Sequence, residues 1–165
     1  TMKSLSNAAT VAIFLTMFSM FTIQNASADS YVTIGGLVSH VGSDGYTDQK
    51  GFHTYNERNN NILGIEVVNE ETQVGLGSLW FSNSYGNEGG LLYASKYWKL
   101  NDNVKVGALG GVVYGYKDWQ INDRLRIGNE LHVMVAPTAK VQYENLFTQI
   151  SAYGNAVVVT IGIKL

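Results

Sequence analysis

Apolar and polar side chains alternate with a period of two residues along most of the chain after residue 28. In the C-terminal segment Val157, Val159 and Ile161 alternate with Val158 and Thr160. One face of this segment is large and apolar throughout, whereas the other face becomes small or polar. Such alternation is typical of β-strands whose two faces meet different surroundings.

The same period predicts eight strands, at residues 31–41, 62–68, 72–82, 91–100, 104–115, 131–142, 146–153 and 156–165. Short connections, at 69–71, 101–103 and 144–145, alternate with longer ones, at 42–61, 83–90 and 117–128. An even number of strands, with short turns at one end and long loops at the other, is the plan of outer-membrane barrels. We therefore predict an all-β fold, an eight-stranded antiparallel transmembrane β-barrel of the outer-membrane type, with both termini on the periplasmic side.

A soluble periplasmic sandwich or a lipocalin-like barrel would also have alternating strands. The alternatives differ in which face is polar. The face that we assign to the lumen carries Glu66, Lys105, Lys140, Gln142 and Lys164, and the opposite face is nearly free of charge. A charged interior and an apolar exterior favour the membrane barrel. Aromatic residues near strand ends suit its interfacial girdles, and they are Tyr31, Trp80, Tyr97, Trp98, Tyr114, Tyr116, Tyr143 and Tyr153.

The first 28 residues follow another pattern. Lys3 precedes an apolar run at residues 8–23, which leads to Ala26-Ser27-Ala28. A basic start, an apolar stretch and small residues predict a secretory signal peptide that is cleaved after Ala28. A membrane-anchor helix is the alternative. We expect residues 29–165 to form a single barrel domain in the bacterial outer membrane.

Composition excludes several classes of site. The chain has no cysteine, so neither disulfides nor thiolate metal ligands are available. A formal net charge of −2 and the lack of a basic block argue against a nucleic-acid partner. No histidine and carboxylate spacing predicts a metal site, and the paired glycines do not form a phosphate loop. We expect a monomer without a cofactor.

The predicted lumen changes character along its length. If the first strand rises from the periplasm, the inward residues of the outer half are apolar, namely Leu37, Leu109, Val113, Gly115, Met134, Ala136, Ala156 and Val158. The periplasmic half is polar, with Lys105, Thr138, Lys140, Gln142, Thr160 and Lys164. An eight-stranded barrel is too narrow for a water channel. An apolar pocket open toward the outer end suits a hydrocarbon chain, and a packed interior without a ligand is the alternative.

Two groups capable of chemistry fall on the outer rim of this pocket. His40 ends the first strand, and Asn83-Ser84 follows the third. Together with the segments Tyr55-Asn56-Glu57-Arg58, Lys117-Asp118-Trp119 and Val135-Ala136-Pro137-Thr138-Ala139, they occur in an order that resembles the outer-membrane lipid A palmitoyltransferase (PagP) family. The resemblance spans nearly all of the chain after the predicted signal peptide.

The resemblance implies an enzyme that moves a palmitoyl chain from a phospholipid donor to lipid A in the outer leaflet. The histidine, aspartate and serine of the family fall on His40, Asn83 and Ser84. Pro137 corresponds to one lateral gate, where a missing N–H weakens strand pairing. Gly35 and Asn59 stand at the other gate, where the proline of the family is absent.

The departure at Asn83 matters, because an amide cannot compensate the charge of a histidine as a carboxylate does. We expect His40 to act as the general base on the acceptor hydroxyl, with Ser84 and Asn83 polarising the ester or positioning the acceptor. Leu37, Val113, Met134 and Pro137 would contact the acyl chain. Arg58 would pair with a lipid phosphate.

Two further readings compete with catalysis. A non-catalytic outer-membrane barrel could bind or block a surface partner with its extracellular loops, and Asn83 favours this alternative. A purely structural barrel is the third possibility. In either case His40 would be a rim histidine without a catalytic role.

Overall fold

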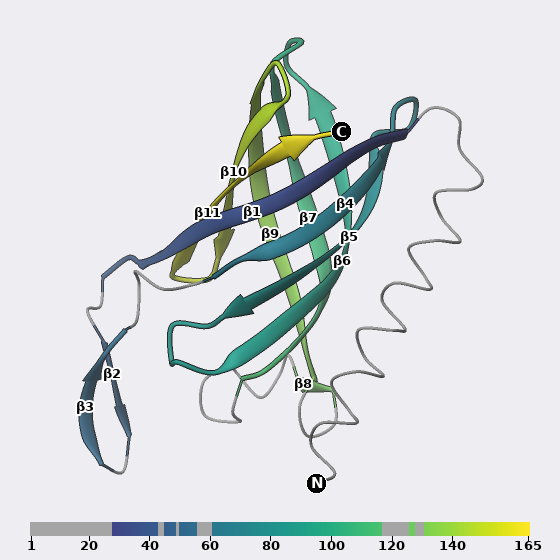
Figure 1. Ribbon diagram of the computed structural model, residues 1–165. Helices are drawn as coiled ribbons and strands as arrows, with labels where there is room; N and C mark the ends of the chain where they lie inside the picture. The colour runs from purple at the N-terminus through teal and green to yellow at the C-terminus, as the bar shows by residue number, and fades with distance from the viewer. Residues whose placement is uncertain (1–27, 43–44, 49, 56–60, 117–125, 128–130) are drawn as a thin grey trace, which may run out of the picture.

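Eight long antiparallel strands close into a barrel in the computed structural model (Figure 1). The structure describes residues 28–42, 45–48, 50–55, 61–116, 126–127 and 131–165. The barrel strands are β1 (Ala28–His40), β4 (Leu63–Asn69), β5 (Val74–Ser82), β6 (Glu88–Lys99), β7 (Val104–Tyr114), β9 (Leu131–Tyr143), β10 (Leu146–Tyr153) and β11 (Ala156–Lys164). Each pairs with the next in this order, and pairing of β11 with β1 closes the barrel. The predicted fold class is confirmed.

The two ends of the barrel differ as the sequence predicts. Short turns connect β4 to β5, β6 to β7 and β9 to β10 at one end, which we call the turn end. The opposite end, the loop end, carries the connections from β1 to β4, from β5 to β6 and from β7 to β9. The first of these contains a hairpin that was not predicted, made of β2 (Gly45–Asp48) and β3 (Gly51–Thr54), which projects away from the barrel in Figure 1. A two-residue strand, β8 (Arg126–Ile127), pairs with the start of β9.

The outer surface of the barrel is apolar. Large aliphatic side chains point away from the lumen along the barrel strands, and the most exposed include Ile34, Leu63, Val135, Val141, Leu146, Ile150 and Ile161. In water such a surface would be unfavourable, so it fits contact with lipid. Among the residues described, no helix is long and apolar enough to cross a membrane. Trp98 and Tyr143 lie on the outer surface, but the girdle prediction is wrong for Tyr31 and Tyr97, which are buried in the lumen, and for Tyr116 and Tyr153, which also line its interior.

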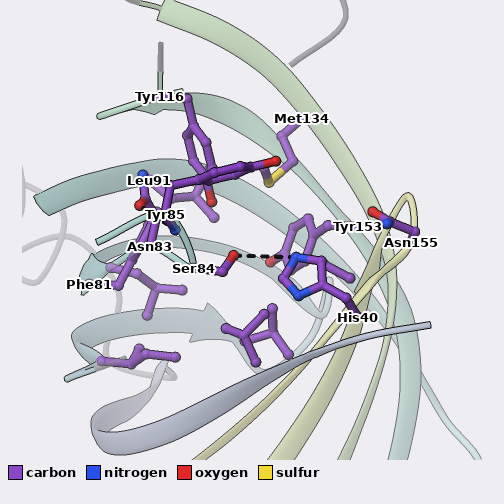
Figure 2. A pocket seen from close by; sticks show the side chains of 15 residues that line it. His40, Phe81, Asn83, Ser84, Tyr85, Leu91, Tyr116, Met134, Tyr153 and Asn155 are labelled. Atoms are coloured by element: carbon purple, nitrogen blue, oxygen red, sulfur yellow. Dashed lines mark hydrogen bonds between the residues drawn. The ribbon is translucent and has the colours of Figure 1, made fainter. Parts of the chain in front are cut away.

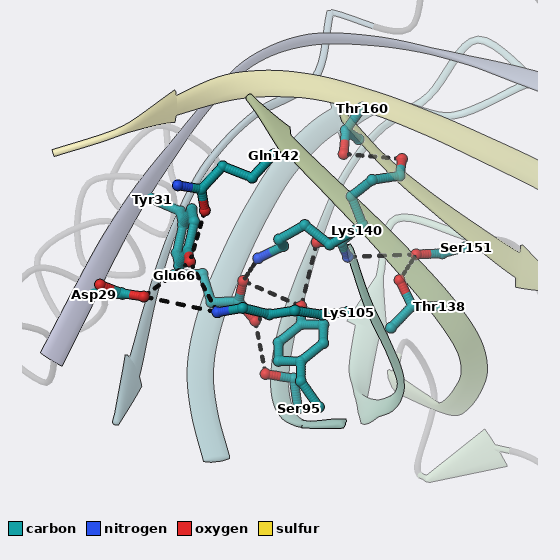
Figure 3. A network of polar contacts seen from close by, with 12 residues as sticks. Asp29, Tyr31, Glu66, Ser95, Lys105, Thr138, Lys140, Gln142, Ser151 and Thr160 are labelled. Atoms are coloured by element: carbon teal, nitrogen blue, oxygen red, sulfur yellow. Dashed lines mark hydrogen bonds and ion pairs between the residues drawn. The ribbon is translucent and has the colours of Figure 1, made fainter. Parts of the chain in front are cut away.

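The lumen of the turn half is filled by a polar network (Figure 3). Lys140 Nζ lies 2.5 Å from Glu66 Oε2, and both side chains are almost fully buried. Glu66 Oε1 accepts hydrogen bonds from the hydroxyls of Ser95, at 2.6 Å, and Tyr97, at 2.9 Å. A second group joins Asp29 to the ammonium groups of Lys105 and Lys164. This placement confirms the predicted polar half.

A β-bulge in β1 changes which of its side chains face inward. The register against β11 shifts between Thr33 and Gly35, so that Ile34 is an extra residue. Before the bulge odd-numbered side chains such as Thr33 are buried, and after it Val38 and His40 line the lumen. Leu37 therefore points outward and is 50% exposed, so its predicted lumenal position is wrong. An inserted residue reverses the two-residue phase beyond it.

Strand pairing ends early at two seams on the loop side. Pairing of β9 with β10 stops at Thr138 and Ser151, although β9 continues beyond them to Leu131. Pro137 is the first residue past the last pair, and a proline has no N–H to donate. Pairing of β1 with β4 stops at Thr33 and Gly64, although β1 continues to His40. The loop-end parts of β10, β11 and β1 thus form a panel between two seams.

Candidate functional site

An apolar cavity of about 150 Å³ opens at the loop end of the lumen (Figure 2). Its apolar walls come from several strands and include Val38, Ile62, Leu79, Phe81, Leu91, Met134 and Val158. Leu91 also belongs to a buried cluster with Tyr93, Leu109, Val113 and Ala136, onto which Leu79, Phe81 and Met134 pack. The cavity thus rests on a packed apolar layer, and the polar network of the turn half lies beyond it. The predicted division of the lumen is confirmed.

His40 and Ser84 meet at the rim of this cavity. The distance between Ser84 Oγ and His40 Nε2 is 3.3 Å, and Figure 2 shows the two side chains pointing toward each other. His40 is the last residue of β1, and the bulge turns it inward. Ser84 lies in the turn between β5 and β6, where its side chain is buried. An imidazole in contact with a hydroxyl can accept its proton or hold it in one orientation.

Asn83 precedes Ser84 and is only 2% exposed. Both ends of its side-chain amide form hydrogen bonds with the backbone. Nδ2 donates to the carbonyl oxygen of Gly115 at 2.8 Å. Oδ1 accepts from the N–H groups of Tyr85 and Asn87, at 3.1 and 2.9 Å. The amide thereby closes the turn 83–87 and ties it to the end of β7. In the described part of the chain its bonds reach neither His40 nor Ser84, so it acts on the pair only by fixing the turn.

Aromatic rings surround the pair on the loop side. The ring of Tyr55, just after β3, stacks on the imidazole of His40 with centroids 3.7 Å apart and planes 11° apart. Tyr85 meets Tyr55 edge to face at 5.5 Å, and Tyr116 meets Tyr85 in the same way at 6.2 Å. Burial raises the pKa of Tyr116 to about 12. Burial, followed by a hydrogen bond with Tyr55, raises the pKa of Tyr85 as well, so both phenols are neutral near pH 7.

The predicted lipid contacts divide into three groups. Met134 lines the cavity, and Val113 lies in the buried cluster next to it. Leu37 and Pro137 are on the outer surface, Pro137 at the end of a seam. Arg58 lies outside the described residues, as do Asn59 and the segment 117–119.

Several lining residues were not predicted, among them Val38, Leu79, Phe81 and Leu91. Counting back by two from an inward His40 would have found Val38. The contact between Tyr55 and His40 had no comparable signal, because it depends on the path of a loop. Across the described ranges no three histidine or acidic residues gather as metal ligands. The chemistry available to the site is that of an imidazole, a hydroxyl and an apolar cavity.

Comparison with known proteins supports the fold. No protein-family model matches the chain, and no curated protein matches it. A de novo designed transmembrane β-barrel is similar with a TM-score of 0.50 at 10% identity, over 86% of this chain and 98% of the design. Ail, the attachment invasion locus protein of Yersinia pestis, aligns with a TM-score of 0.37 at 15% identity, over 84% of this chain and 99% of Ail. The similarity to the design agrees with a transmembrane barrel and says nothing about activity.

Proposed function

We propose that the protein is an acyltransferase of the bacterial outer membrane, which moves an acyl chain from a phospholipid to lipid A at the outer leaflet. The observation that carries the proposal is the contact of 3.3 Å between His40 and Ser84 at the mouth of an apolar cavity. The family resemblance of the sequence points to the same reaction. Phospholipid and lipid A are therefore the proposed partners of the site.

The cavity supports an acyl chain as the ligand. Its walls are aliphatic and aromatic, and its polar groups gather at the mouth, where His40, Asn83, Ser84 and Asn155 lie. A hydrocarbon chain is held by burial of apolar surface, at roughly 0.8 kcal/mol for each methylene group. A chain seated in the cavity leaves its ester beside the imidazole. Lipid from the surrounding leaflet would enter through one of the two seams, at Pro137 or beside the bulge of β1.

The reaction needs one base and one group that holds the reacting atoms. His40 takes the proton of the acceptor hydroxyl as its oxygen bonds to the ester carbonyl carbon. The ester C–O bond of the donor then breaks, and the imidazolium returns the proton to the leaving lysophospholipid oxygen. Ser84 donates a hydrogen bond to the developing oxyanion or positions the acceptor. Asn83 supports this step by fixing the turn that presents Ser84.

Lipid A mass spectra test the proposal. We expect cells that express the wild-type protein to contain lipid A with one added acyl chain. Cells that express Ser84→Ala or His40→Ala should lack the added chain, at equal amounts of folded barrel. Thr47→Ala, a change at an exposed site on the hairpin, is the matched control and should leave the product unchanged. The same spectrum from all strains would contradict acyl transfer.

A non-catalytic barrel with a binding loop is the second candidate function. It is favoured by the hairpin of β2 and β3, which projects beyond the loop end with Phe52 65% exposed. An aromatic residue presented in this way suits contact with a partner at the cell surface. On this account Phe52→Ala would reduce binding of the partner while His40→Ala would not. On the acyl-transfer account, His40→Ala would remove the added acyl chain from lipid A and Phe52→Ala would not.

A further inference from the structure

We propose that Tyr55 is the positioning residue of His40 and does for this imidazole what a carboxylate does in other histidine-dependent sites. The inference rests on the proposed function and adds a residue to its machinery. A catalytic histidine usually has a partner that fixes its ring plane and compensates its positive charge. Asn83 does neither directly, since both ends of its amide bond to the backbone.

The geometry of the ring pair carries the proposal. Centroids 3.7 Å apart with planes 11° apart place the face of Tyr55 flat against the imidazole. On another side of the ring, Ser84 Oγ contacts Nε2 at 3.3 Å. Rotation of the imidazole about its Cβ–Cγ bond would break both contacts. The stack therefore keeps Nε2 directed toward the mouth of the cavity.

Tyr55 is itself held by its neighbours. Tyr85 packs edge-on against it with an interplanar angle of 83°, and Tyr46 of β2 lies 5.7 Å away. Tyr85 directly follows Ser84 in the chain, so the turn that presents the hydroxyl also supports the ring behind the base. The hairpin loop and the turn 83–87 are thereby joined through His40.

Electrostatics give the stack a second effect. The face of an aromatic ring carries partial negative charge and attracts a cation. A tyrosine face against His40 thus stabilises the imidazolium that forms when the base takes a proton. Among the described residues, the titratable groups of this rim include Tyr46 and His53 from the hairpin, Tyr55, Tyr85, Tyr116 and Tyr153. No carboxylate from the described part of the chain lines the cavity.

The test compares Tyr55→Phe, which keeps the ring, with Tyr55→Leu, which removes it. In a purified assay with phospholipid and lipid A, we expect Tyr55→Leu to lower kcat at least tenfold with little change in KM. Tyr55→Phe should stay within about threefold of wild type. Phe52→Leu is the matched control, since it removes an exposed ring of the same hairpin and leaves the stack on His40 in place. Circular dichroism and resistance to unfolding in detergent show whether each barrel has formed.

A titration of His40 by NMR, without substrate, separates this inference from the proposed function. Loss of a cation–π contact worth about 0.5–1 kcal/mol lowers the titration midpoint by roughly half a unit. We expect this shift in Tyr55→Leu and not in Tyr55→Phe. If the wild type transfers no acyl chain, the proposed function fails and the titration alone decides the role of Tyr55. A titration unchanged in Tyr55→Leu would overturn the inference, as would a loss of kcat in Tyr55→Phe equal to that in Tyr55→Leu.

Discussion

The ion pair of Glu66 and Lys140 offers a sharp test of how the polar half of the lumen stabilises the barrel. The ammonium and carboxylate are 2.5 Å apart, with the side chains 1% and 4% exposed, so water screens neither charge. The ammonium of Lys140 also lies 3.9 Å from the ring centre of Tyr31 and 4.7 Å from that of Tyr97. Removing one partner of such a pair leaves an uncompensated buried charge. The expected loss is about 3–5 kcal/mol.

The perturbation is Lys140→Met, which keeps the length of the side chain and removes its charge. Glu66→Gln is its counterpart, because the amide oxygen can still accept from Ser95 and Tyr97. We expect each single variant to lose about 3–5 kcal/mol of the free energy of unfolding. The double variant should lose less than the sum of the two, with a coupling energy of about 2 kcal/mol or more.

Urea unfolding in detergent micelles, followed by tryptophan fluorescence, measures these losses. With a slope of about 1–3 kcal/mol per molar urea, the midpoint of each single variant should fall by roughly 1 M or more. Leu165→Ala, at an exposed terminal side chain, is a control that should unfold near the wild-type midpoint. Single variants that lose under about 1 kcal/mol, with additive effects in the double variant, would refute the reasoning.

Three further predictions concern the loop half. Asn83→Asp introduces a carboxylate but removes the donor to the Gly115 carbonyl, so urea unfolding should show a loss of about 1–3 kcal/mol with no gain in acyl transfer. Pro137→Val restores an N–H at the seam between β9 and β10, and assays should show slower transfer at unchanged or higher stability. Leu91→Ala deepens the cavity where it meets the buried cluster, so the free energy of unfolding should fall by about 2–5 kcal/mol. Lipid A mass spectra of the same variant should show longer transferred chains.

The barrel could be predicted from the sequence because its interior and exterior impose opposite polarity on alternate residues. Lys105 and Lys140 are buried in the lumen of the turn half, as the alternation predicts, and Lys164 pairs there with Asp29 while its side chain stays 28% exposed. Leu37 shows the limit of a prediction from two-residue periodicity. The alternation of inward and outward side chains reverses at Ile34, and a two-residue period cannot reveal an inserted residue. Gly36 was a possible signal of the bulge, because a Cβ at this position would lie 2.6 Å from the carbonyl oxygen of Val159.

The site was predictable in part for the same reason. His40 and Ser84 end up in contact because antiparallel strands bring β1 and β5 to the same end of the barrel. The roles of Asn83 and Tyr55 depend on loop conformation, which follows from specific hydrogen bonds and ring contacts rather than from periodicity. The stack of Tyr55 on His40 could therefore be found only in the folded chain.

Acyl transfer by the purified protein is the most direct test of the account. The barrel is reconstituted in detergent with a phospholipid whose acyl chain carries an isotope label, together with unlabelled lipid A. We expect the label to appear on lipid A with the wild type and an equal amount of lysophospholipid to form. Folded Ser84→Ala should form neither product. Transfer by Ser84→Ala at the wild-type rate, or no transfer by the folded wild type, would contradict the account.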